Sequence, residues 1–205
     1  MAVTLNASTS SGFIQTADTS GDLALQSNGT TQLTVSSTGA YGQLKASTVV
    51  TPTSGTSVDF TGLPTWVRRV TVMLAGVTTS STSPIIIQIG AGSFASTLYS
   101  GTAGGVANTG NIMTVASYTN GFGMGAAVGN ADQKYNGTLS ICLVDSATGL
   151  WAASGSTSLA PGSFTGVQTC GGSRTLSGTL DRIRITTSGG AATFTAGSIN
   201  ILYEG

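Results

Sequence analysis

The stretch Leu139-Ser-Ile-Cys-Leu143 alternates apolar and polar residues, and this pattern decides the fold class. A period of two places alternate side chains on opposite faces of a strand, which predicts a β-strand with one buried face. The same alternation recurs at 70–74, 85–89, 182–185 and 199–203. No long window keeps a helical period of 3.6. The sequence therefore predicts an all-β protein, an antiparallel β-sandwich of the jelly-roll kind.

The composition excludes several classes of function. The 205 residues include 7 Lys+Arg, 7 Asp+Glu, 2 Cys, 30 Gly and no His, and only 7% are charged. Nucleic-acid binding needs clustered Lys and Arg, and catalytic Ser-His or Cys-His pairs and His-ligated metals need His. We therefore expect no nucleic-acid partner, no cofactor and no enzyme activity. We also expect no membrane segment and no secretory signal, because the longest apolar run, near Ile85, is short and the N-terminus lacks a basic region before an apolar one.

Residues 1–46 form a predicted N-terminal segment, and residues 47–205 form the predicted sandwich. Two alternating stretches, 23–26 and 32–35, flank Asn28-Gly29, which is a strong hairpin signal. A lone hairpin is marginal in water, so we expect its apolar face to dock on a partner. The candidate attachment residues are Phe13, Ile14, Leu23, Leu25, Leu33 and Val35.

Turn signals separate the later strands, among them Asn120-Gly121 and Asn136-Gly137. The Gly-rich region 100–130 is open to two interpretations, long surface loops or tightly packed short strands. Within it, Gly121-Phe-Gly-Met-Gly125 fits either a flexible or a close-packed loop.

Few residues suggest a catalytic or metal-binding site. Asp18 and Asp22 lie in a Gly-Ser turn that fits a turn better than a calcium loop. Asp132 and Asp145 could form a glycosidase acid pair, although nothing singles them out among seven acids. We therefore assign no catalytic and no metal-binding residue.

Two cysteines and two aromatic residues complete the candidates. Cys142 and Cys170 are too few for a zinc site, and free thiols are favoured over a disulfide. Tyr135 and Trp151 flank turn-like stretches and are the candidates for contact with a surface ligand such as a host glycan.

Three stretches carry a resemblance to a family. Residues 17–35, which begin Ala17-Asp-Thr-Ser-Gly-Asp22, resemble a block of fibre and appendage proteins of tailed bacteriophages. Residues 55–74, with Gly62-Leu-Pro-Thr-Trp66, and residues 178–203 are similar to blocks of phage virion structural proteins. Residues 100–175 carry no such similarity.

The resemblance implies a homotrimeric, all-β part of the virion, assembled in the host cytoplasm from this and other phage structural proteins. It implies a tail-fibre-like appendage with an N-terminal attachment segment and a knob that contacts the host. A capsid cement or head-decoration protein is the alternative, since the sequence does not separate head from tail. A carbohydrate-binding module is the third interpretation.

Overall fold

The computed structural model describes residues 23–27, 30–36, 39–40, 44–107, 112–126, 131, 133–159 and 165–205. The chain divides into two compact units, Met1–Gln43 and Leu44–Gly205. The boundary lies three residues before the one predicted at 46/47, because β4 (Leu44–Ala46) pairs with the last strand of the second unit.

The first unit contains the predicted hairpin. Strands β1 (Leu23–Ser27) and β2 (Thr30–Ser36) pair antiparallel, with Leu25 opposite Leu33 and Leu23 opposite Val35. A short strand that was not predicted, β3 (Gly39–Ala40), extends the sheet to three strands in the order β1-β2-β3. The hairpin itself is confirmed at the level of the backbone.

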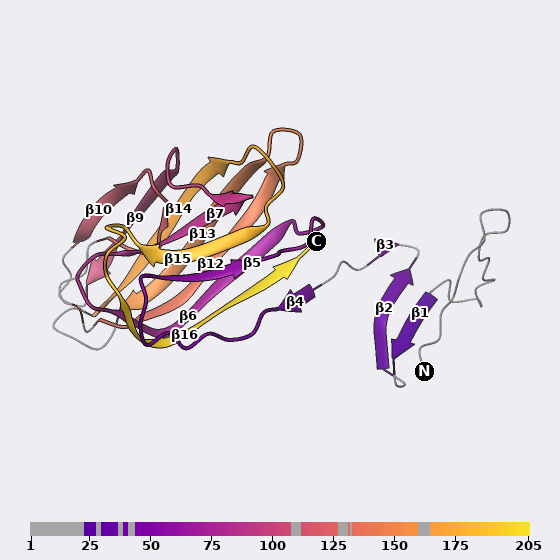
Figure 1. The fold of residues 1–205 in the computed structure, drawn as a ribbon, viewed down its shortest axis with the longest axis horizontal. Helices are drawn as coiled ribbons and strands as arrows, with labels where there is room; N and C mark the ends of the chain where they lie inside the picture. Colours follow the sequence, from indigo (N-terminus) through magenta and orange to yellow (C-terminus); the bar gives the residue numbers. More distant parts are fainter. Residues whose placement is uncertain are drawn as a thin grey trace. The chain divides into compact units, whose positions relative to one another are not determined.

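The second unit contains two antiparallel sheets (Figure 1). The larger sheet has the order β10-β9-β14-β13-β12-β6-β16-β4. Its remaining strands are β6 (Arg69–Thr79), β9 (Ser100–Ala107), β10 (Ile112–Tyr118), β12 (Tyr135–Asp145), β13 (Leu150–Leu159), β14 (Gly166–Thr175) and β16 (Phe194–Glu204). Three neighbouring pairs in this order, β10-β9, β14-β13 and β13-β12, are consecutive in the chain, and the other four pairs join strands that are distant in the sequence.

The smaller sheet has the order β11-β7-β15-β5, and β8 pairs with β7. Its strands are β5 (Ser57–Thr61), β7 (Ile85–Ala91), β8 (Ser93–Phe94), β11 (Phe122–Gly123) and β15 (Arg182–Thr187). In Figure 1 it lies in front of the larger sheet.

The core lies between the inner faces of the two sheets. Leu139, Ile141 and Ile201 of the larger sheet and Ile185 and Ile87 of the smaller sheet are fully buried in one continuous cluster. Each fully buried aliphatic side chain stabilises the fold by about 1.5–3 kcal/mol. The predicted all-β antiparallel sandwich is thus confirmed, while its jelly-roll character stays a prediction.

The described residues of the Gly-rich region, 100–107 and 112–126, form packed strands and a buried segment rather than long surface loops. β9, β10 and β11 all lie within it, and residues 121–126 are buried. A Cβ at Gly123 would overlap the Tyr118 ring, and one at Gly125 would overlap the Gln168 side chain. Gly121-Phe-Gly-Met-Gly125 is therefore a close-packed segment, and the glycines allow the contact.

The turn predicted at Asn136-Gly137 is wrong, because both residues lie within β12. The ladder to β6 shifts register between Tyr135 and Gly137. A Cβ at Gly137 would overlap the Ser156 carbonyl on β13. The Asn-Gly pair here marks a bulge and a close strand approach rather than a chain reversal.

Candidate functional site

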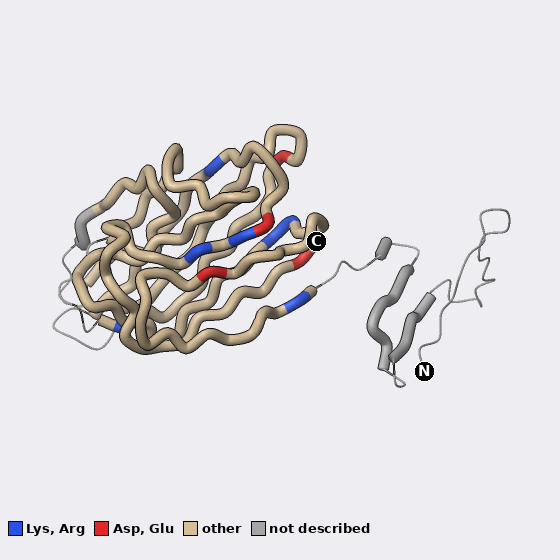
Figure 2. The backbone as a smooth tube through the Cα atoms, in the orientation of Figure 1, with Lys and Arg blue, Asp and Glu red and all other residues tan. Residues whose placement is uncertain are grey.

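The outer face of the smaller sheet carries paired charges (Figure 2). The Arg184 guanidinium donates two hydrogen bonds, of 2.8 and 2.7 Å, to the Asp59 carboxylate on the neighbouring strand. Arg182 donates likewise to Asp181, at 2.7 and 3.0 Å. The Arg184 guanidinium also lies 4.1 Å from the centre of the Phe94 ring. This face is polar and suited to contact with water.

The outer face of the larger sheet is different, and we call it the hydroxyl face. The residues that belong to the hydroxyl face are identified by the alternation of buried and exposed residues and by the strand register. Its charged members are Arg69 and Glu204, which pair with each other, and Asp145, the last residue of β12, which lies opposite Leu150. Its other members include Ser100, Thr102, Gly104, Val106, Val167, Thr169, Ser173, Ala152, Ser154, Ser156, Ser158, Thr138, Ser140, Cys142, Thr71, Met73, Ser198, Asn200 and Leu202.

Three valines form an exposed apolar cluster at one end of the hydroxyl face. Val106 on β9 lies directly opposite Val167 on β14, and their exposed fractions are 55% and 58%. Val115 on β10 is 64% exposed and lies over Gly104, where a Cβ would meet its side chain. Exposed apolar side chains that gather in one place often mark a protein interface.

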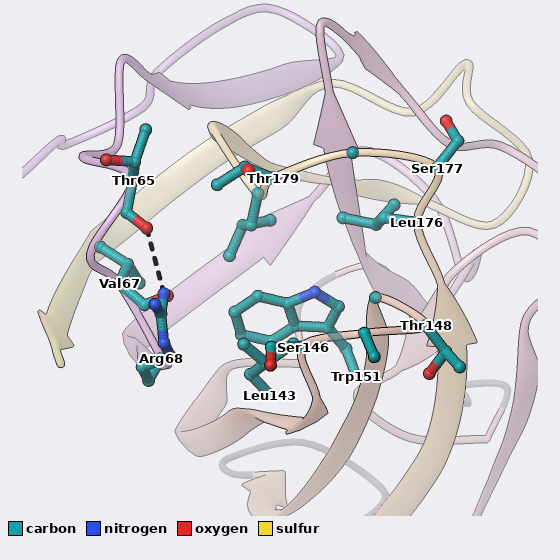
Figure 3. A pocket seen from close by; sticks show the side chains of 14 residues that line it. Thr65, Val67, Arg68, Leu143, Ser146, Thr148, Trp151, Leu176, Ser177 and Thr179 are labelled. Atoms are coloured by element: carbon teal, nitrogen blue, oxygen red, sulfur yellow. Dashed lines mark hydrogen bonds between the residues drawn. The ribbon is translucent and has the colours of Figure 1, made fainter.

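A pocket of about 430 Å³ opens at one end of the sandwich (Figure 3). Three connections that are distant in the sequence build it: the 62–68 connection, the 146–149 turn after β12 and the 176–180 segment after β14. In Figure 3 the Trp151 indole lies among Val67, Leu143 and Leu176. Arg68 at its rim donates to the Thr65 carbonyl oxygen at 3.0 Å.

No acid–base pair is present among the residues that line this pocket. Arg68 is the only ionisable side chain among its lining residues, which otherwise offer apolar groups and Ser and Thr hydroxyls. General acid–base catalysis needs a proton donor and a proton acceptor near pH 7, and an arginine with hydroxyls supplies neither. A second, more open pocket is lined by one carboxylate, Asp59, which Arg184 already binds.

The two predicted contact residues are buried in the core, which corrects that expectation. Tyr135 is 1% exposed and Trp151 is 2% exposed. Both have the strand parity of inward residues, since Tyr135 shares its face with Leu139, and Trp151 shares its face with Ala153. Burial raises the pKa of the Tyr135 hydroxyl. Neither ring offers a free face to a sugar, although Trp151 contributes to the pocket wall.

The predicted attachment residues lie largely outside the described part of the chain. Phe13 and Ile14 are not described, and Leu23, Leu25, Leu33 and Val35 are described by their strand backbone only. The register nevertheless places the four strand residues as two opposed pairs. Their role in attachment stays a prediction.

The acidic candidates do not come together as a site in the described residues. Asp18, Asp22 and Asp132 lie outside them. Asp145 is the partly exposed last residue of β12, and its carboxylate accepts hydrogen bonds from the Thr148 hydroxyl and the Ala147 amide, both at 2.8 Å. The bond from Thr148 is the main reason that the pKa of Asp145 lies below its usual value.

The cysteines are both free, as favoured from the sequence. Cys142 is partly exposed on the hydroxyl face, whereas Cys170 faces the core, where burial raises the pKa of its thiol to about 11. Across the described ranges, no three His, Cys, Asp or Glu side chains are grouped to hold a metal ion. None of the described segments is a helix long and apolar enough to cross a membrane.

The sequence did not reveal the pocket or the valine cluster. The pocket depends on which three connections meet in space, and no local motif marks them. The valines had a usable signal, since Val106 and Val167 interrupt Gly- and Thr-rich stretches, but only the strand register shows that they are neighbours.

Comparison of the chain with protein-family models, curated proteins and solved structures found no match.

Proposed function

We propose that the chain is a non-enzymatic structural protein of a tailed-bacteriophage particle. In this proposal it is a homotrimeric appendage that attaches through its N-terminal unit and presents the sandwich to the host surface. The observation that carries the proposal is the division into a small three-stranded unit and a much larger sandwich. The sandwich has a continuous core of its own, so the N-terminal unit is available for attachment.

The surface chemistry supports a structural rather than a catalytic role. The charged groups on the smaller sheet are neutralised in pairs, and the pocket at the end of the sandwich lacks an acid–base pair. An uncharged sheet rich in Ser, Thr and Gly suits a protein that acts through extended contacts. A capsid-decoration protein would use the same features, so the position on the particle separates the two.

Deletion of residues 1–43 tests the proposal. The boundary spares β4, which pairs with β16. We expect the truncated protein to give the circular dichroism of a folded β-protein but to be reduced at least about tenfold in purified particles. Incorporation at the wild-type level would contradict attachment through this unit.

A paired substitution gives a sharper version of the same test. Leu25→Asp with Leu33→Asp adds two charges at one cross-strand pair, and Ala24→Asp with Thr34→Asp adds them at the neighbouring pair on the other face. We expect only the first pair to abolish incorporation, because it removes the apolar face that docks. Equal loss from both pairs would show that the hairpin fold, rather than one face of it, is what matters.

A further inference from the structure

The two outer faces of the sandwich differ in charge. Asp59, Asp181, Arg182 and Arg184 gather at the smaller sheet, on β5 and β15 and just before β15. On the hydroxyl face, the long strands β9, β14 and β13 contribute no charged side chain at outward positions, and β12 contributes only its last residue, Asp145, opposite Leu150. Burying a charge is costly unless it is paired, so the hydroxyl face can be buried at little electrostatic cost.

The hydroxyl face is also compatible with itself. A hydroxyl both donates and accepts hydrogen bonds, so two such faces can satisfy each other, which two lysine-rich faces cannot do. The whole chain has a formal net charge of zero, and proteins near zero net charge do not repel copies of themselves. Short Ser, Thr and Ala side chains also lose little rotamer entropy when they are ordered.

Both ends of the larger sheet carry exposed apolar side chains. Val106, Val115 and Val167 lie at the β10 end. Leu44, which is 62% exposed, lies on β4 at the other end, and Val49, which is 54% exposed, follows shortly after it. In a ring of identical subunits, each interface joins one edge of a subunit to a different edge of the next copy. Here both edges of the larger sheet, at β10 and at β4, carry exposed apolar side chains.

Edge strand β10 adds a separate reason for a protein partner. It runs for seven residues, Ile112–Tyr118, without a charge or a proline. On the side away from β9, no strand in the described part of the chain pairs with it. Natural proteins usually protect such edges with charges, prolines or a cover, so this edge favours a covered position in an assembly.

The area is large enough for a stable interface. Six long strands, β9, β14, β13, β12, β6 and β16, lie side by side in the sheet. With strands about 4.8 Å apart and outward residues about 6.7 Å apart along each strand, four outward residues per strand cover about 800 Å². A standard protein interface buries about 800 Å² on each partner.

We propose that the hydroxyl face is buried against other copies of this chain. The inference rests on the proposed function and deepens it, because it assigns the surface through which the homotrimer assembles. A glycan is a poorer occupant, since no outward position on the six long strands holds an aromatic ring on which a sugar could stack.

Two matched variants of the full chain test the assignment. Thr169 on β14 is exposed on the hydroxyl face, and Thr61 on β5 is exposed on the opposite face, across from Arg182. We expect Thr169→Glu, combined with Ser154→Glu, to weaken self-association at least about 100-fold in sedimentation equilibrium. Thr61→Glu should leave the mass of the wild-type assembly unchanged.

The cysteines provide a second readout that needs no variant. We expect a maleimide to label Cys142 slowly at about 10 µM protein and faster on dilution, as the face becomes exposed. Cys170, buried in the core, should react only in denaturant. This measurement decides the matter if the double variant does not fold.

Several results would overturn the inference. They are a monomeric wild-type protein at about 10 µM, an unchanged mass for the folded double variant, or Cys142 labelling that does not depend on protein concentration. Protection of Cys142 by added dextran alone would instead assign the face to a neutral polysaccharide. A trimer in purified particles whose folded double variant keeps the same mass refutes only this inference, whereas a trimer absent from purified particles refutes only the proposed function.

Discussion

Tyr99 and Phe122 pack edge to face between the two sheets, with ring centroids 5.0 Å apart and ring planes at 88°. The Tyr99 hydroxyl accepts a hydrogen bond from the Ile89 amide at 2.8 Å. Phe122 belongs to the close-packed segment 121–126, and its backbone pairs with Ile87. This contact therefore fixes the Gly-rich segment against both β7 and the chain that enters β9.

Replacing Phe122 with alanine should lower the free energy of unfolding by about 3–5 kcal/mol, because it leaves a cavity in the core. Urea denaturation followed by tryptophan fluorescence measures the change. Phe94→Ala is the control, since that ring lies at the surface under Arg184, and it should cost less than about 1.5 kcal/mol. Equal losses for the two variants would contradict the central place of Phe122.

Gly125→Ala should destabilise the protein by about 1–3 kcal/mol, since the added methyl group would overlap the Gln168 side chain in a filled core. Gly178→Ala is the matched change, because a Cβ there meets only Ala91 at an ordinary contact distance of 3.4 Å. Thermal unfolding should show a clear decrease in Tm for the first variant and almost none for the second. A neutral Gly125→Ala would mean that the segment is not close-packed in solution.

Stability should fall as the pH rises from about 10 to about 12. Burial raises the pKa of Tyr99 and of Tyr118 to about 12 in the folded protein, whereas an unfolded tyrosine titrates near 10. Above pH 10 the unfolded state thus loses protons that the folded state keeps, which favours unfolding. Urea midpoints measured from pH 8 to pH 12 test this, and a flat profile would contradict the buried environment of both phenols.

Arg184→Gln should lower the stability by about 1 kcal/mol or less, because the pair with Asp59 is partly exposed. The double variant with Asp59→Asn should lose less than the sum of the two single changes, since the interaction is removed only once. A double-mutant cycle in urea, repeated at high salt, measures the coupling. Strict additivity would show that the pair contributes nothing.

The alternation of residues was enough to predict the sandwich and most of its inward positions. Leu139 and Ile141 are buried as predicted, and the hairpin at 23–35 pairs as predicted at the backbone. Tyr135 was predicted at the surface because Asn136-Gly137 looked like a turn. The even spacing between Tyr135 and Leu139 already indicated that both side chains face the core. Local signals therefore worked where each residue's neighbours are close in sequence.

The candidate surfaces could not be predicted in the same way. The hydroxyl face depends on the order of strands that are distant in the sequence, such as β9 beside β14. Val106 and Val167 are 61 positions apart in the chain and become neighbours only through that pairing. The pocket near Trp151 likewise needs three separate connections to meet at one end of the sandwich.

The location of the protein on purified phage particles tests the central claim most directly. An antibody against residues 44–205 can be combined with electron microscopy and with quantitative mass spectrometry of the same particles. The account predicts labelling at the tail and a copy number divisible by three. Labelling over the head would replace the appendage with a decoration protein, and absence of the chain from purified particles would contradict the account.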